Sequence, residues 1–194
     1  MTTLELRVAR RWVEGESVVA FDLVPPEGTL LPPIEAGAHV DVTLPTPIAG
    51  TPAVRSYSPW GDPADRGRLR LAIQREEAGR GGSRHLFDHV REGDVLRVGT
   101  PRNLFALRET APFCLLLAGG IGITPLLSMA ARLVRLGRPF ALHHAARSRA
   151  RAPLWSFTEA LCGDRARLHL DDGPAEDRLD LEALAQAMPE GGEV

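Results

Sequence analysis

The chain has 194 residues, of which 44% are hydrophobic and 25% charged, and its formal net charge is −2. That length accommodates one large domain or two small ones, and the composition is ordinary for a globular protein. The slightly acidic balance excludes the broad basic surface that nucleic-acid binding requires.

The N-terminal stretch MTTLELRVARRWV has no long apolar core and no small-residue cleavage site, so it is not a signal peptide. The longest apolar run, residues 113–118, is far too short to cross a bilayer. Cys114 and Cys162 lie far apart, and two thiols cannot supply the four ligands of a plant-type iron–sulfur cluster. We therefore expect a cytoplasmic protein with two buried free cysteines that contacts neither membrane nor nucleic acid.

The first half of the chain is strand-like. Residues 40–44 and 69–74 alternate apolar with polar side chains, and residues 18–24 and 95–98 are short apolar runs. Short strands separated by proline and glycine turns predict a closed antiparallel barrel or a sandwich. One helix interrupts them over residues 83–90, with Ser83 as its expected N-cap.

The periodicity changes after Pro112. Strands and helices then alternate, over residues 113–118, 125–136, 140–146, 153–161, 166–170 and 180–188. This alternation predicts a parallel sheet wrapped by helices, with the boundary between the two halves near residues 101–112. Residues 190–194 resemble the turn into a fourth parallel strand.

A glycine-rich turn, Gly119-Gly120-Ile121-Gly122-Ile123-Thr124-Pro125, follows an apolar strand and opens a helix. Glycines allow a sharp turn and a close approach of phosphates to the main chain, and free N–H groups at a helix start favour a pyrophosphate. We expect Thr124 to cap this helix and Pro125 to lie in its first turn. The pattern is GxGxxP rather than GxGxxG, and a tight turn without a ligand is the alternative.

Two further motifs lie in the strand-rich half. In Arg55-Ser56-Tyr57-Ser58, an arginine can pair with a phosphate and a tyrosine can stack on a flat ring, although an ordinary surface strand explains it as well. In Gly79-Arg80-Gly81-Gly82-Ser83, main-chain N–H groups at a helix start can hold a second phosphate, and a flexible turn is the alternative.

Taken together, the segments RSYS at 55–58, GRGGS at 79–83, PRNLF at 101–105 and GGIGITPLLSM at 119–129 resemble the ferredoxin-reductase superfamily. The resemblance is greatest to the phthalate dioxygenase reductase and vanillate demethylase reductase group, and it covers essentially the whole chain. It implies a six-stranded antiparallel flavin-binding barrel over residues 1–106. A parallel-sheet α/β domain that binds NAD(P) would follow over residues 107–194, truncated at its C-terminus.

The resemblance also implies the cofactor-binding residues. Those implied for the flavin are Arg55, Ser56, Tyr57, Ser58, Ala72, Ile73, Gln74, Gly81, Gly82, Ser83 and Thr124. Those implied for the nicotinamide nucleotide are Gly120, Gly122, Pro125, Arg147, Ser148, Asp171 and Asp172. Members of this group bind FMN rather than FAD.

The implied activity is hydride transfer from NADH to FMN, followed by electron transfer to an iron–sulfur centre that serves an aromatic-ring oxygenase or demethylase. The acceptor would be a ferredoxin domain or the oxygenase component. Placement and electrostatics dominate such chemistry, so we name no catalytic acid or base and no metal ligand. Asp171 and Asp172 favour NADH while Arg147 and Arg149 favour NADPH; the group resemblance favours NADH.

Three departures from the family pattern concern the end of the chain. The Cys-Gly-Pro motif on the strand after the third helix is not reached, and neither the [2Fe–2S] domain nor the last part of the sheet is present. We expect a fragment of a longer reductase or a truncated product. The alternatives are a non-catalytic flavin- or nucleotide-binding module and a general NAD(P)H:flavin reductase.

Some histidines and tryptophans invite other interpretations. His85 and His89 have a zinc-compatible spacing but no evident third ligand, so an exposed helix face explains them better. His143 and His144 should project to opposite faces of a strand in structural roles. Trp60 follows the RSYS segment closely enough to lie near the flavin.

Overall fold

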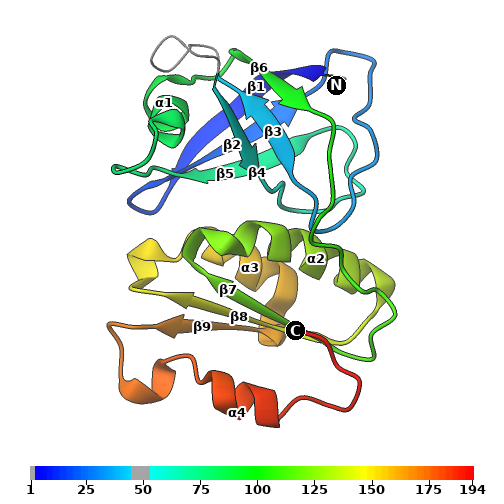
Figure 1. Ribbon diagram of the computed structural model, residues 1–194, viewed down its shortest axis with the longest axis vertical. Helices are drawn as coiled ribbons and strands as arrows, with labels where there is room; N and C mark the ends of the chain where they lie inside the picture. The colour runs from blue at the N-terminus through cyan, green and yellow to red at the C-terminus, as the bar shows by residue number, and fades with distance from the viewer. Residues whose placement is uncertain (1–2, 45–52) are drawn as a thin grey trace.

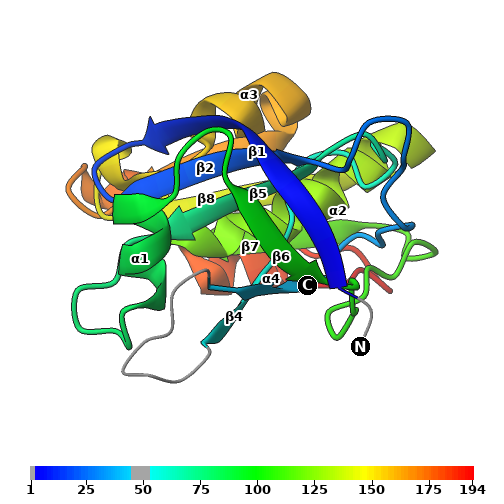
Figure 2. The ribbon, with the colours of Figure 1, turned by 90° about the horizontal axis from the view of Figure 1, so that it is seen from above.

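The computed structural model describes residues 3–44 and 53–194. Its first half is a six-stranded antiparallel sheet in the order β4-β3-β6-β1-β2-β5. The strands are β1 (Thr3–Glu14), β2 (Val18–Val24), β3 (Val40–Thr43), β4 (Val54–Tyr57), β5 (Leu69–Gln74) and β6 (Val95–Gly99), and helix α1 (Gly82–His89) packs beside them. The sheet curls into a barrel (Figures 1 and 2), which confirms the barrel prediction over the sandwich.

The period-two alternation explains the barrel core. On β5, Leu69, Leu71 and Ile73 are buried in one hydrophobic cluster with Phe21 of β2 and Val42 of β3. The intervening residues of β5 face the other way, and Ala72 belongs to a second cluster. Alternate side chains of a strand lie on opposite faces, so this one strand contributes to both clusters.

The second half is a parallel sheet in the order β7-β8-β9, formed by β7 (Cys114–Gly119), β8 (Phe140–Ala146) and β9 (Ala166–Leu170). The helices are α2 (Ile123–Leu136), α3 (Trp155–Cys162) and α4 (Leu181–Gln186). Helix α2 lies between the sheet and the barrel, and α4 lies on the opposite side of the sheet (Figure 1). Glu193 forms a parallel bridge with Cys114, at the position expected for a further strand beside β7.

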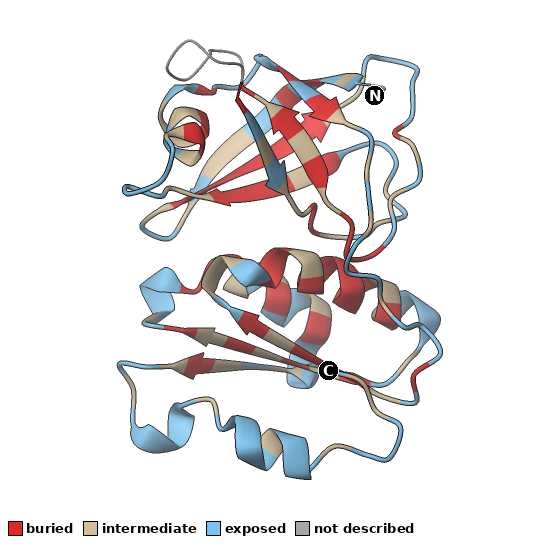
Figure 3. Cartoon of the chain, viewed as in Figure 1, coloured by how far each residue is buried: buried red, intermediate tan, exposed pale blue. Residues whose placement is uncertain are grey.

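The two halves share a buried interface. The second hydrophobic cluster joins Ala20 and Ala72 of the barrel to Leu126 and Met129 of α2. Figure 3 shows that many residues of α2 are buried, whereas α4 is mostly exposed. Burial of apolar area from both halves favours a fixed relative placement.

Three aromatic rings join the two halves at a second point. Trp60, on the β4–β5 connection, packs 4.9 Å from Phe157 of α3 and 6.3 Å from Trp12 of β1, measured between ring centroids. The Trp60 side chain is buried. Trp60 is therefore a packing residue of the interface.

Two expected helix caps are wrong. The N-cap of α1 is Gly81, at φ 84°, and Ser83 Oγ accepts a hydrogen bond from the Glu76 amide at 3.1 Å. The N-cap of α2 is Gly122, and Thr124 lies inside the helix, where its Oγ1 donates to the Ile121 carbonyl at 3.2 Å. Because glycine reaches the left-handed region without strain, Gly81 can serve as the N-cap of α1, two residues before the expected Ser83.

Candidate functional site

A cavity of about 490 Å³ lies between the barrel and the turn from β7 to α2. We call it the flavin-side cavity. It brings together the three motifs that were singled out in the sequence. Its lining comprises Arg55, Ser56, Tyr57, Ser58, Ala72, Gln74, Glu76, Gly79, Gly82, Ser83, Ile121, Gly122, Thr124 and Pro125. The strands at the two ends of the sheet order, β4 and β5, both contribute, because the curl of the barrel brings them together.

Arg55 lies directly over the start of helix α1. Its Nη1 donates to the Val54 carbonyl at 2.8 Å and its Nη2 to the Arg80 carbonyl at 3.4 Å. A Cβ atom placed on Gly82 would lie 2.7 Å from Arg55 Nε, so only glycine leaves room for this side chain. The guanidinium and the free N–H groups of the first helical turn thus converge on one end of the cavity, which is a favourable environment for a phosphate.

Tyr57 supplies the aromatic wall of the same cavity. Burial raises the pKa of the Tyr57 phenol to about 12, and the nearby Arg55 charge lowers it only in part. The hydroxyl therefore remains protonated at neutral pH. It can act as a neutral hydrogen-bond donor while the ring offers a flat apolar face.

Alternation along β5 separates the predicted residues of that strand. Ala72 and Gln74 line the cavity, whereas Ile73 is buried in the barrel core. The side chain of Ile73 therefore points away from the cavity. Gly81 is not among the lining residues, and its part is to begin helix α1 in the left-handed region, at φ 84°.

A histidine on the neighbouring strand forms a hydrogen bond with the glycine turn after β7. Gly120 has φ 49°, and its carbonyl oxygen lies 3.0 Å from Nε2 of His144 on β8. A carbonyl only accepts, so Nε2 must carry the proton. Burial lowers the pKa of His144, although the bond to Gly120 acts in the opposite direction. A neutral His144 thus fixes the turn that lies beside both cavities.

A second cavity of about 540 Å³ opens at the carboxyl ends of the parallel strands. We call it the sheet-end cavity. Of the residues predicted for the nucleotide, Gly120, Arg147 and Asp171 line it. The others do not: Gly122 and Pro125 line the flavin-side cavity instead, and Ser148 and Asp172 line neither. Open parallel sheets bind ligands at this end of their strands, so the location agrees with a nucleotide site. Gln74 and Glu76 line both cavities, so the two cavities adjoin each other.

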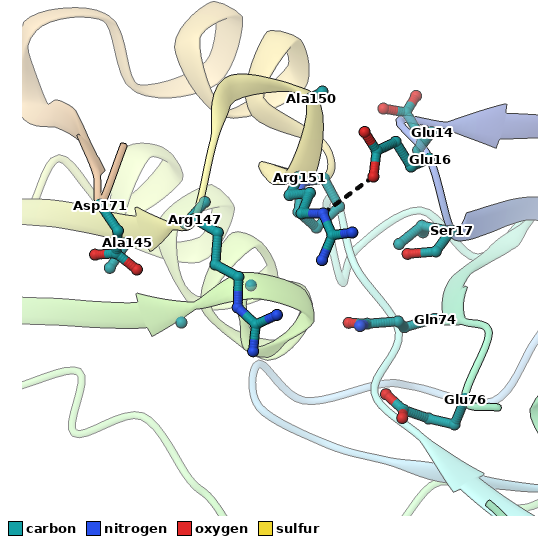
Figure 4. Close-up of a pocket in the computed structure, with 15 residues that line it drawn as sticks. Glu14, Glu16, Ser17, Gln74, Glu76, Ala145, Arg147, Ala150, Arg151 and Asp171 are labelled. Atoms are coloured by element: carbon teal, nitrogen blue, oxygen red, sulfur yellow. Dashed lines mark hydrogen bonds and ion pairs between the residues drawn. The ribbon is translucent and has the colours of Figure 1, made fainter. Parts of the chain in front are cut away.

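Sequence reasoning missed the barrel's contribution to the sheet-end cavity. Glu14, Glu16 and Ser17, at the turn between β1 and β2, line it opposite Arg151 (Figure 4). Arg151 Nε donates to Glu16 Oε2 at 3.0 Å, across 135 positions of the chain. No local pattern marks these residues, because the contact arises only from the way the two halves pack.

The antiparallel barrel, the parallel α/β unit and the two adjoining cavities define a ferredoxin-reductase-like fold. The sequence profile of the oxidoreductase FAD-binding domain family matches residues 6–106, and the chain belongs to this family.

Several reductase components of oxygenases are similar to this chain. The chain is 43% identical to the phenoxybenzoate dioxygenase subunit beta of Ectopseudomonas oleovorans and 38% identical to a vanillate O-demethylase oxidoreductase of a Pseudomonas species, over 98% and 97% of its length. It spans 58% of the length of each of these relatives. The solved structure of phthalate dioxygenase reductase, described as transferring electrons from pyridine nucleotides to [2Fe–2S], superposes with a TM-score of 0.87 at 33% identity. That match covers 98% of this chain and 58% of the other.

Over residues 3–44 and 53–194, no helix combines the length and the apolar character needed to cross a membrane.

Proposed function

We propose that this chain binds FMN and NADH and forms the part of an oxygenase reductase in which hydride passes from nicotinamide to flavin. Electrons would then pass to an iron–sulfur centre, on a ferredoxin domain or an oxygenase component, that serves an aromatic-ring oxygenase or demethylase. The observation that carries the proposal is the convergence of the RSYS, GRGGS and GGIGITP segments on the flavin-side cavity. The adjoining sheet-end cavity supplies the second site.

The residues of the flavin-side cavity fit FMN. We assign the phosphate to Arg55, the main chain of Gly82 and Ser83, and the isoalloxazine ring to Tyr57, Ser58 and the face of β5 that carries Ala72 and Gln74. The arginine stacked on Gly82 makes a cationic end to the cavity, which suits a terminal phosphomonoester. The terminal phosphomonoester of FMN carries more negative charge than either phosphate of the FAD pyrophosphate, so FMN is the better match for this cationic end.

The chain's own residues position the reactants. Thr124 and Pro125 of α2 line the flavin-side cavity opposite β4, while the same glycine turn borders the sheet-end cavity. We assign Gly122 to the wall between the flavin and the nicotinamide. When bound, the flavin supplies the hydride acceptor and the one-electron chemistry; the protein holds the two rings together and limits access of water.

The charges of the sheet-end cavity favour NADH. Four carboxylates line it, from Glu14, Glu16, Glu76 and Asp171, against the two guanidinium groups of Arg147 and Arg151. NADPH carries an additional phosphate and would be disfavoured by this excess of negative charge. The free, buried thiols of Cys114 and Cys162 suit the reducing cytoplasm that we propose as the location.

We place the domain boundary between residues 106 and 107, in the segment that links β6 to β7. The flavin domain would then be residues 1–106 and the nucleotide domain residues 107–194. This division assigns Arg55, Tyr57 and Gly82 to the first domain and the glycine turn to the second.

The test is flavin binding followed by reduction. The purified chain is titrated with FMN and with FAD, and the protein with bound FMN is mixed anaerobically with NADH while flavin absorbance is followed. We expect FMN to bind in the micromolar range or tighter, more tightly than FAD, and to be bleached by NADH. Binding without bleaching would favour the non-catalytic module, and no FMN binding at micromolar concentrations would refute the proposal. Steady-state NADH oxidation with ferricyanide measures turnover.

A further inference from the structure

One ion pair in the lining of the sheet-end cavity joins the two halves of the chain. Glu16 lies on the turn between β1 and β2, and Arg151 ends the short helix η2 (Arg149–Arg151) that follows β8. Their side chains meet at 3.0 Å (Figure 4). Both residues line the cavity, so the pair is part of its wall.

Backbone packing fixes this contact. Gly15 precedes Glu16 with φ 63°, and a Cβ atom at Gly15 would overlap the carbonyl oxygen of Ala150. Only glycine permits both the left-handed conformation and this close approach. The main chain of the turn therefore packs closely against η2, and this packing brings the side chains of Glu16 and Arg151 together.

Stability does not account for the pair. The Arg151 side chain is 51% exposed and the Glu16 side chain 57% exposed. Exposed ion pairs contribute little to folding, because water screens them and ordering two long side chains costs entropy. A charge pair that lines a cavity instead alters the electrostatic field met by a ligand.

The position of the pair matches one part of a dinucleotide. This step rests on the proposed function. In parallel α/β sheets, residues at the end of the strand that follows the glycine turn face the adenosine ribose. An acidic group there accepts from the 2′-hydroxyl, and an arginine there accommodates a 2′-phosphate. Here that strand is β8, and the residues after it supply Arg147 and Arg151 to the cavity.

The two arginines differ in their partners. Among the residues the structure describes, Arg147 has no carboxylate within 4.0 Å, whereas Arg151 is paired with Glu16. A 2′-phosphate carries up to two negative charges near pH 7. It would therefore meet one arginine that is already neutralised, together with the carboxylate that neutralises it.

We propose that Glu16, contributed by the barrel, determines nucleotide preference by neutralising Arg151, so that the sheet-end cavity accepts a ribose with a free 2′-hydroxyl and rejects a 2′-phosphate. Glu16 is a specificity residue that acts through Arg151. Removing its charge frees a guanidinium for the phosphate and removes a repulsive carboxylate at the same time.

The test uses two ligands that need neither flavin nor turnover. Adenosine 5′-monophosphate and adenosine 2′,5′-bisphosphate are titrated calorimetrically into the 194-residue chain, into Glu16→Gln, and into the double variant Glu16→Gln/Arg151→Gln. Glu109→Gln is the matched control. It removes one carboxylate from a comparable exposed pair, with Arg132 at 2.8 Å, that lies outside the cavity.

We expect Glu16→Gln to bind the bisphosphate about tenfold more tightly than the unsubstituted chain does, the effect of one new charge-assisted hydrogen bond, with affinity for the monophosphate unchanged. The double variant should lose this gain, and Glu109→Gln should show none. A bisphosphate affinity unchanged in Glu16→Gln, or a gain that persists in the double variant, would overturn the inference while the proposed function stands. If neither ligand binds the unsubstituted chain, the nucleotide site itself is wrong and the inference fails with it.

Discussion

The contact between Arg55 and Gly82 gives the most direct test of the flavin-side cavity. A methyl group at position 82 would lie 2.7 Å from Arg55 Nε, 2.8 Å from its Cγ and 3.2 Å from its Cδ. The Cγ atom is close to the backbone and has little freedom to move away. Gly82→Ala should therefore displace the whole Arg55 side chain from the start of α1 without altering any other group that lines the cavity.

The expected loss follows from the contact that Arg55 makes with the phosphate. One charge-assisted hydrogen bond contributes about 1.5–3 kcal/mol. Because each 1.4 kcal/mol is a factor of ten in affinity, Gly82→Ala should raise the Kd for FMN by roughly 10- to 150-fold. Quenching of flavin fluorescence during titration measures this directly. Gly67→Ala is the control, because a Cβ there meets only Asp65 Oδ1 at an ordinary 3.4 Å.

A double-mutant cycle with Arg55→Ala distinguishes displacement of Arg55 from direct obstruction of FMN by the added methyl group. If Gly82→Ala acts by moving Arg55, it should have little further effect on FMN affinity once the arginine is removed. In that background alanine should also favour the helix, by up to about 1 kcal/mol relative to glycine. An equal loss of FMN affinity in both backgrounds would show that the added methyl group obstructs the ligand itself, and an unaltered Kd in Gly82→Ala would refute the role of the contact.

Three further predictions concern stability and are measured by urea unfolding. Burial lowers the pKa of His144, so this histidine binds a proton more readily in the unfolded chain than in the folded one. The free energy of unfolding should therefore be greatest above about pH 6.5 and fall as the pH decreases towards the folded pKa. His144→Gln should show a smaller dependence of the free energy of unfolding on pH. Trp60→Ala removes the centre of the interface cluster and should cost about 3–5 kcal/mol, whereas Leu104→Ala, at a side chain 88% exposed, should cost little; equal effects would contradict the assigned packing. Gly37→Ala should be strongly destabilising, because Gly37 has φ 87° and a Cβ there would overlap the Phe105 carbonyl; a stability like that of the unsubstituted chain would argue against this close approach.

Much of the fold follows from local patterns. The strands over Val18–Val24, Leu69–Gln74, Phe140–Ala146 and Ala166–Leu170 have the bounds that alternation and apolar runs predicted. The end of α2 before Gly137 was predicted as well, because a left-handed glycine terminates a helix. These strand bounds and this helix end depend on residues near one another in the chain, so the sequence alone is sufficient to predict them.

Features that depend on packing were not predictable. The strand β1 (Thr3–Glu14) carries so many charged residues that its apolar positions do not stand out, and it is stabilised by pairing with both β2 and β6. Alternation along β5 separates Ile73 from Ala72, but only the closed barrel and its contact with the second half show that the face with Ala72 lines a cavity. The contact of Glu16 with Arg151 needs both halves in place.

The end of β5 has a consequence for how ligands bind. Gln74 and Glu76 belong to the walls of both cavities, so a ligand that contacts either residue in one cavity touches a side chain that also faces the other. We expect these shared residues to couple the two sites, and the factor by which one occupant changes the affinity of the second must equal the factor in the reverse direction. A titration of either ligand alone therefore measures its affinity only for the chain whose second cavity is empty. Substitutions at this strand end should alter the coupling between the two ligands as well as the affinity for each.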